Sequence, residues 1–219
     1  MATLSLQDLA NQLDYYQVKM WIQYYQEDSG KTGAGDDLAA DLADPVWRAE
    51  ITIDPKLTHA QAAAAQARIE MLDGVIGRFY MYDPRLQYPI ADPGGTIIKA
   101  HTGTCRIAEI AADNKRVRFK GLPGGYQLTA GDRWHADIGT DPVHRAYHRI
   151  TSDAQANGAG ETLGWVSVRP HVSPGLAVND IVEFARPSPL WRLIANGYEA
   201  GTGQGQLTPG GSLKMVQVF

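Results

Sequence analysis

Hydrophobic and polar positions first become regular between residues 45 and 93, where they follow a strand, helix and strand pattern. Trp47, Ala49, Ile51 and Ile53 alternate with polar residues, and a period of two predicts a strand with one buried face. A second alternating stretch, residues 79–82, is ended by Asp83-Pro84, because proline cannot donate to a ladder. We therefore predict two strands that flank one helix.

The helix between these strands has a clear start and end. Thr58 with Gln61 three residues later forms a capping-box pattern. One apolar face follows, and Gly74 is a candidate left-handed terminator. We predict a single long helix over residues 58–73.

The chain before residue 45 predicts a strand and a loop. The side chains of residues 15–25 alternate between two faces as in a strand, but both faces carry large side chains, which favours a contact with another subunit. Residues 1–13 predict a short helix or arm. Residues 26–37 are polar and glycine-rich, so a loop is expected. They contain Ser29-Gly30-Lys31-Thr32, but Tyr25 stands where a phosphate-binding loop needs glycine, so we expect no nucleotide site.

The chain after residue 97 predicts short strands separated by turns. This spacing without a helix pattern is typical of a small β-barrel or sandwich. A final apolar strand, 213–219, should pair back into the first sheet, since an exposed apolar edge invites aggregation. We predict a mainly β protein in which residues 1–96 plus 188–219 form one β-domain and residues 97–187 an inserted β-barrel domain. The expected strands after residue 97 are 104–111, 116–120, 132–138, 144–151, 163–169, 180–185, 190–195 and 213–219.

Composition narrows the class of protein. The 219 residues carry a net charge of −4, which gives no reason to expect sequence-specific nucleic acid or an anionic membrane as a partner. No apolar run is long enough to span a bilayer, and the first residues lack a basic region, so neither a membrane segment nor a signal peptide is expected. Cys105 is the single cysteine, and we expect it to be a small buried residue.

The histidines do not form a metal-site pattern. His144 and His148 are four residues apart, but on a strand that spacing is roughly 13 Å, too far for one metal ion. We expect surface or interface histidines, no metal and no cofactor; a metal-dependent β-rich hydrolase is the third alternative for the function. The residues weighed for that alternative are His101, His135, His144, His148, His171, Asp132, Asp137 and Asp141.

Catalytic and carbohydrate-binding signals are weak as well. There is no GxSxG nucleophile elbow, and Ser173 and Ser188 lie next to prolines with no base beside them in sequence, so no enzyme is predicted. The basic run at residues 115–120 favours a half-buried strand with a solvated face over a nucleic-acid surface. Core packing is the default for the tryptophans; Trp134 and Trp165 are the candidates for a sugar-stacking platform.

Taken in order along the chain, the motifs resemble those of the distal tail and tail-tip (baseplate) ring proteins of long-tailed, siphovirus-type bacteriophages. The stretches that carry this resemblance are Trp47 in its strand, the alanine-rich helix 58–72, Gly74 with Gly77, 79–84, Gly121-Leu122-Pro123, 128–132, His148-Arg149-Ile150, Val168-Arg169-Pro170, Asp180-Ile181-Val182 and Trp191-Arg192-Leu193.

The resemblance implies a tail-tube-like β-sandwich or barrel with one flanking helix and an inserted small β-barrel. It implies a structural virion protein, assembled in the host cytoplasm, that forms a homo-oligomeric ring, with six-fold symmetry favoured. Its partners would be the tail tube protein and the hub or baseplate proteins. The alternative expectation is a carbohydrate- or receptor-binding module on the tail tip that contacts the host surface.

Overall fold

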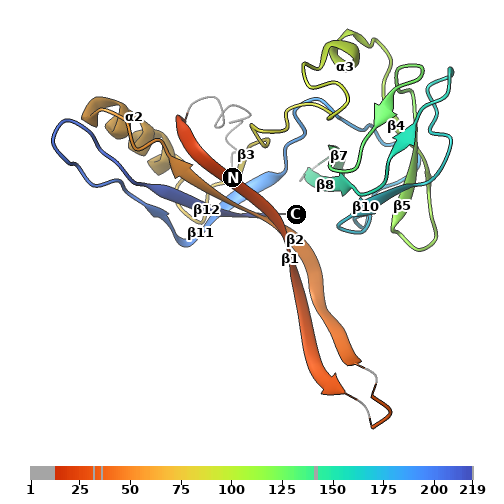
Figure 1. Cartoon of the computed structure of the whole chain (residues 1–219), viewed down its shortest axis with the longest axis horizontal. Helices are drawn as coiled ribbons and strands as arrows, with labels where there is room; N and C mark the ends of the chain where they lie inside the picture. Colours follow the sequence, from red (N-terminus) through yellow and green to blue (C-terminus); the bar gives the residue numbers. More distant parts are fainter. Residues whose placement is uncertain (1–12, 32, 36, 141–142, 219) are drawn as a thin grey trace.

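The computed structural model describes residues 13–31, 33–35, 37–140 and 143–218. The chain is mainly β, with 44% strand and 8% helix, antiparallel sheets and a curled half-barrel, which confirms the expected class. Two five-stranded sheets lie side by side, and a long hairpin projects away from both (Figure 1). The helix or arm predicted at the N-terminus lies outside the described residues, apart from Leu13.

The first sheet has the strand order β1-β2-β12-β11-β3. Its strands are β1 (Tyr15–Lys31), β2 (Asp37–Ile53), β3 (Phe79–Tyr80), β11 (Leu190–Glu199) and β12 (Ser212–Gln217). The last strand, β12, therefore lies between β2 and β11, as predicted for a strand that cannot be left as a free apolar edge. The alternation seen in the sequence is also confirmed, because Trp47, Ala49, Ile51 and Ile53 are all buried.

Helix α2 (His59–Glu70) follows β2 and has the predicted capping box. The Thr58 hydroxyl accepts from the backbone N–H of Gln61, whose side chain reaches back to the Thr58 N–H. Ala65 and Ile69 are the buried residues of this helix. The helix is shorter than the predicted 58–73, because Asp73 already adopts positive φ before Gly74 does.

The second sheet has the strand order β4-β5-β10-β8-β7. A two-stranded pair, β6 with β9, and a short helix, α3 (Thr96–Ala100), complete this part of the chain. The bounds are β4 (Arg106–Ile110), β5 (Arg116–Lys120), β6 (Gln127–Leu128), β7 (Arg133–Ile138), β8 (His144–Ile150), β9 (Ala154–Gln155) and β10 (Val166–Arg169).

Several local predictions after residue 95 are wrong. Residues 180–185 form isolated bridges instead of a strand, at Arg106 to Ile181 and His135 to Glu183. Helix α3 was missed; the Asp92 carboxylate accepts from the N–H groups of residues 96–98 and so holds its first turn. Strand β11 was expected to end at residue 195 but reaches residue 199 past an irregularity in its pairing.

The expected loop at residues 26–37 is instead the end of a long hairpin. Strands β1 and β2 each run for 17 residues and stay paired from Tyr15 opposite Ile53 to Lys31 opposite Asp37. Within the sheets, residues 25–31 and 37–43 pair only with each other, and we call this part the arm. The polar, glycine-rich composition misled the prediction because an exposed hairpin needs no apolar face toward a core.

A buried polar joint connects the two sheets. The Trp47 indole on β2 donates to the backbone oxygen of Tyr147 on β8 over 3.0 Å. Asp83, just after β3, accepts from Arg133 on β7 at 2.6 Å, and both side chains are buried. Arg85 donates to the same carboxylate at 2.7 and 3.0 Å from a half-exposed position. The orientation of the second sheet on the first is therefore held by directional contacts.

No helix among the described residues has the length and apolar composition needed to cross a bilayer.

Replacing Asp83 tests the joint. Burial tends to raise the pKa of Asp83, but the hydrogen bond from Arg85 and the charge of Arg133 outweigh it and hold that pKa below its ordinary value of 3.8. Asp83→Asn should lower the free energy of unfolding at pH 7 by about 3–5 kcal/mol, because Arg133 is left buried without its counter-charge. Urea denaturation measures this loss.

The sign of the pH dependence provides the control. A carboxylate with a lowered folded pKa stabilises the fold fully above its unfolded pKa of 3.8, and that contribution is lost as the pH falls through the folded pKa. The gap between wild type and Asp83→Asn should therefore narrow below pH 3.8. A gap that stays constant down to strong acid would contradict the assignment.

Candidate functional site

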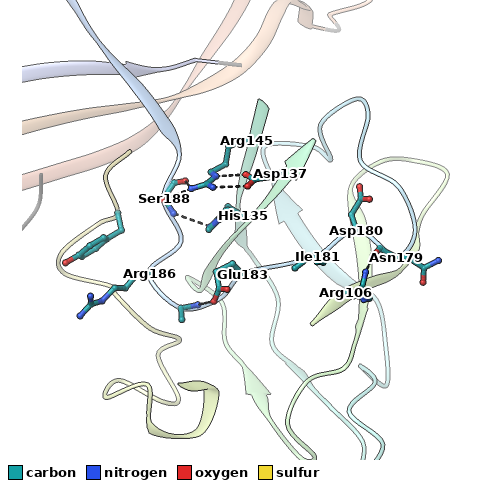
Figure 2. A pocket seen from close by; sticks show the side chains of 12 residues that line it. Arg106, His135, Asp137, Arg145, Asn179, Asp180, Ile181, Glu183, Arg186 and Ser188 are labelled. Atoms are coloured by element: carbon teal, nitrogen blue, oxygen red, sulfur yellow. Dashed lines mark hydrogen bonds and ion pairs between the residues drawn. The ribbon is translucent and has the colours of Figure 1, made fainter. Parts of the chain in front are cut away.

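A polar groove with a volume of about 760 Å³ opens beside the joint, between the second sheet and the segment that returns to the first (Figure 2). Most of its lining side chains are charged or polar. They are Tyr82, Arg106, His135, Asp137, Arg145, Asn179, Asp180, Ile181, Glu183, Ala185, Arg186 and Ser188.

An arginine and carboxylate pair occupies one end of this groove. Arg145 on β8 donates to both oxygens of Asp137 on β7, at 2.6 and 2.9 Å. The same guanidinium donates to the Ser188 hydroxyl at 3.0 Å and lies 4.1 Å from the ring centroid of Tyr80. Burial tends to raise the pKa of Asp137, but the Arg145 hydrogen bonds and charge lower it below its usual range. The guanidinium group of Arg145 is thus bound by side chains of its own chain.

His135 lies beside this pair but does not act as a base on Ser188. Its Nδ1 accepts from the backbone N–H of Ser188 at 3.3 Å, which places the ring proton on Nε2 (Figure 2). Burial, together with the positive charge of Arg145, lowers the pKa of His135 to about 3. The ring is therefore neutral and only weakly basic at pH 7. Its Nδ1 accepts from the Ser188 backbone, whereas the Ser188 hydroxyl is bound to Arg145.

The other end of the groove has hydrogen-bonding groups on irregular backbone. Arg106 donates to the backbone oxygen of Asn179 at 2.6 Å, and the Asn179 side chain accepts from Lys120 at 2.6 Å. The carboxylates of Asp180 and Glu183 accept backbone N–H groups two or three residues away. This end carries charged and amide groups, and Tyr82, the aromatic residue of the lining, is buried.

The structure brings one serine and histidine pair together that the sequence did not indicate. Ser173 Oγ is 3.4 Å from Nε2 of His148, whose Nδ1 donates to the Pro170 oxygen at 3.1 Å. Burial lowers the pKa of His148 to about 4, despite that hydrogen bond, so the ring is a weak base. Its ring packs 4.6 Å from that of Trp134 in the core. A packing role accounts for all of these contacts.

The remaining histidines are separated. His101 bonds the Gly121 oxygen at 2.7 Å, and His171 is exposed. The expectation of surface or interface histidines is wrong for His148, which is fully buried. Among the described residues, which exclude Asp141, no three metal-binding side chains lie close enough to share an ion.

The basic run at residues 115–120 contains strand β5, which is half-buried as predicted. In β5, Val117 and Phe119 are buried, whereas Arg116 and Arg118 face outward and pair with Asp113 and Glu109. Cys105 is buried as expected, and burial raises its pKa to about 11, so the side chain is a thiol at neutral pH.

The tryptophans considered for sugar stacking are not free platforms. Trp134 is fully buried and packs edge-on to Phe119, so its suggested role in stacking is wrong. The ring of Trp165 is half-buried, and the guanidiniums of Arg116 and Arg118 lie 5.7 and 5.6 Å from its centroid.

Several exposed apolar side chains of the described residues lie on the hairpin. Tyr16, Trp21, Tyr24 and Leu42 are 73%, 38%, 46% and 65% exposed. Strand β1 is also the edge of its sheet, so one row of its backbone N–H and C=O groups has no partner strand among the described residues. The hairpin is therefore the candidate interface with another chain.

The two tryptophan positions should respond differently to truncation. Trp134→Ala should lower the free energy of unfolding by about 3–5 kcal/mol, since it leaves a large core cavity. Trp165→Ala removes arginine stacking at a half-exposed site and should lower it by only about 1–2 kcal/mol. Chemical denaturation of both variants measures the difference, and equal losses would contradict the burial described here.

Comparison with known proteins assigns no family to this chain. No protein-family model matches its sequence. No curated protein matches it at a significant level either. A function must therefore be argued from the residues and the fold.

Proposed function

We propose that the chain is a structural protein of a phage tail tip, in which identical copies form a ring that joins the tail tube to the hub or baseplate. The observation that carries this proposal is the exposed hairpin on an unpaired sheet edge. The collinear motifs that resemble tail-tip ring proteins supply the class of assembly. A tail-tube-like fold for the first sheet is part of the proposal.

A closed ring requires two different contact surfaces on each subunit. The first sheet has two chemically distinct edges that suit this requirement. At one edge, β1 pairs only with β2; at the other, β3 covers just Leu190 and Trp191 of β11. A strand at one edge of one copy can extend the sheet at the opposite edge of the next.

The arm gives an independent reason to expect a partner. An isolated two-stranded hairpin is marginally stable in water, because neither face is covered. The described side chains at 26–31 and 39–43 are exposed, so most of the arm is uncovered by the rest of the chain. Contact with a neighbouring subunit, or with the tube or hub, would cover it.

The test is the mass of the full chain in solution over a concentration series, by native mass spectrometry or light scattering. We expect a closed assembly, with six copies favoured. Leu42→Glu should shift it toward monomer, because a charge on the arm opposes burial. Leu163→Glu is the matched control, since Leu163 is 66% exposed, like Leu42 at 65%, but lies outside the hairpin.

Two outcomes would contradict the ring. One is a monomer at every concentration that also fails to join purified tail tube or hub protein. The other is an assembly that Leu42→Glu and Leu163→Glu weaken equally, which would place the contact elsewhere.

The second candidate function is binding of a carbohydrate or host receptor. The polar groove favours it, because donors and acceptors converge there from several segments (Figure 2). This function is compatible with a tail-tip ring, since the groove lies away from the arm.

Glycan screening of the full chain tests this second function. If the groove is the site, Arg106→Ala should abolish a detected signal, because Arg106 lines the groove, whereas Arg192→Ala, an exposed position on β11, should retain it. A signal that survives Arg106→Ala would place the binding site outside the groove.

A further inference from the structure

Three arginines stand directly opposite one another across neighbouring strands of the second sheet. Arg133 on β7 is opposite Arg149 on β8, and Arg149 is opposite Arg169 on β10. Directly opposite residues share a face of the sheet, and like charges in such positions repel. Negative charge close to the three guanidinium groups would offset this repulsion.

The described residues supply only part of that charge. Asp83 neutralises Arg133 and is shared with Arg85. Arg149 is half-buried and has no carboxylate partner among the described residues; its recorded contact is with the ring of Trp47, 4.7 Å from the centroid. Burial, and after it the charges of Arg133 and Arg85, lower the pKa of Arg149, although the charge of Asp83 opposes this shift.

Arg85, Arg133 and Arg149 line a surface depression. Its volume is about 410 Å³, and its walls are Met20, Arg85, Leu86, Gly131, Arg133 and Arg149. Arg133 is also incompletely satisfied, because its buried Nε has no hydrogen-bond partner among the described residues. The depression therefore combines three guanidinium groups, one shared carboxylate and an unused buried donor.

We propose that this depression is an oxyanion-binding site, in which Arg149, with Arg85 and Arg133 beside it, holds a phosphate or a carboxylate group. Guanidinium groups bind both through paired N–H donors, and a second anion would relieve the repulsion along the arginine row. The arginine row lies on the face opposite the buried core of the second sheet. The proposal does not rest on ring assembly, although Met20 of β1 is one wall of the depression.

The experiment is thermal unfolding of the full chain at pH 7 with inorganic phosphate or succinate, at an ionic strength matched with sodium chloride. We expect one of the two anions to raise the Tm in a saturable way, by about 3 °C at ten times its Kd. A rise with phosphate alone identifies a phosphate site, and a rise with succinate alone identifies a carboxylate site.

Arg149→Gln should abolish the rise. The Tm without anion is measured alongside, because the substitution removes a repelling charge and also the contact with the Trp47 ring. Arg192→Gln is the matched control and should keep the full rise, since Arg192 is exposed on β11, outside the depression. Arg85→Gln, at a half-exposed position that leaves Asp83 paired with Arg133, should reduce the rise and covers the case in which Arg149→Gln does not fold.

A wild-type chain with no saturable rise in either anion would overturn the proposal. So would a rise of equal size in Arg149→Gln, because that result would reflect a general effect of the salt on protein surfaces.

Discussion

The buried contact between Arg133 and Asp83 is the constraint on which the arrangement of the two sheets depends. It joins a strand of the second sheet to the segment that follows β3 in the first, and the Trp47 indole bonds the Tyr147 backbone alongside it. Burying an ion pair has a desolvation penalty, and separating the two residues would leave one buried charge without its partner. The two sheets therefore have few alternative arrangements. Arg133 of this joint is also a wall of the arginine depression.

Burial also decides what the polar residues can do chemically. His135 and His148 are held neutral by low-dielectric surroundings, and each is oriented by a backbone group. Ser188 is bound to Arg145, and Ser173 meets only a weakly basic ring. His148 is thus part of the core packing, and Ser188 and His135 are held by neighbours within the chain, whereas the sequence analysis gave the arginines of the second sheet no role in binding.

Assembly and binding in the groove would use different parts of the molecule, whereas the depression borders both, because Met20 of β1 is one of its walls. The hairpin offers exposed apolar side chains and an unpaired strand edge, which suit contact with another β-rich chain. The groove and the depression offer charged groups on the second sheet, which suit small polar or anionic ligands. A ring built through the first sheet would leave the second sheet available for such contacts.

The sequence by itself determined the mainly β class, the capped helix, the buried faces of β2 and β5, and the return of the last strand, because these follow from local periodicity and the cost of an exposed apolar edge. It did not determine the arm, since residues 26–31 lack an apolar face, or α3, because five residues are too few to show a helical period even though the nearby Asp92 caps them. Only the tertiary structure placed Arg133, Arg149 and Arg169 opposite one another and buried His148 against Trp134. Strand register and burial arise from pairings between segments far apart in the chain, and the spacing of residues along one strand does not encode them.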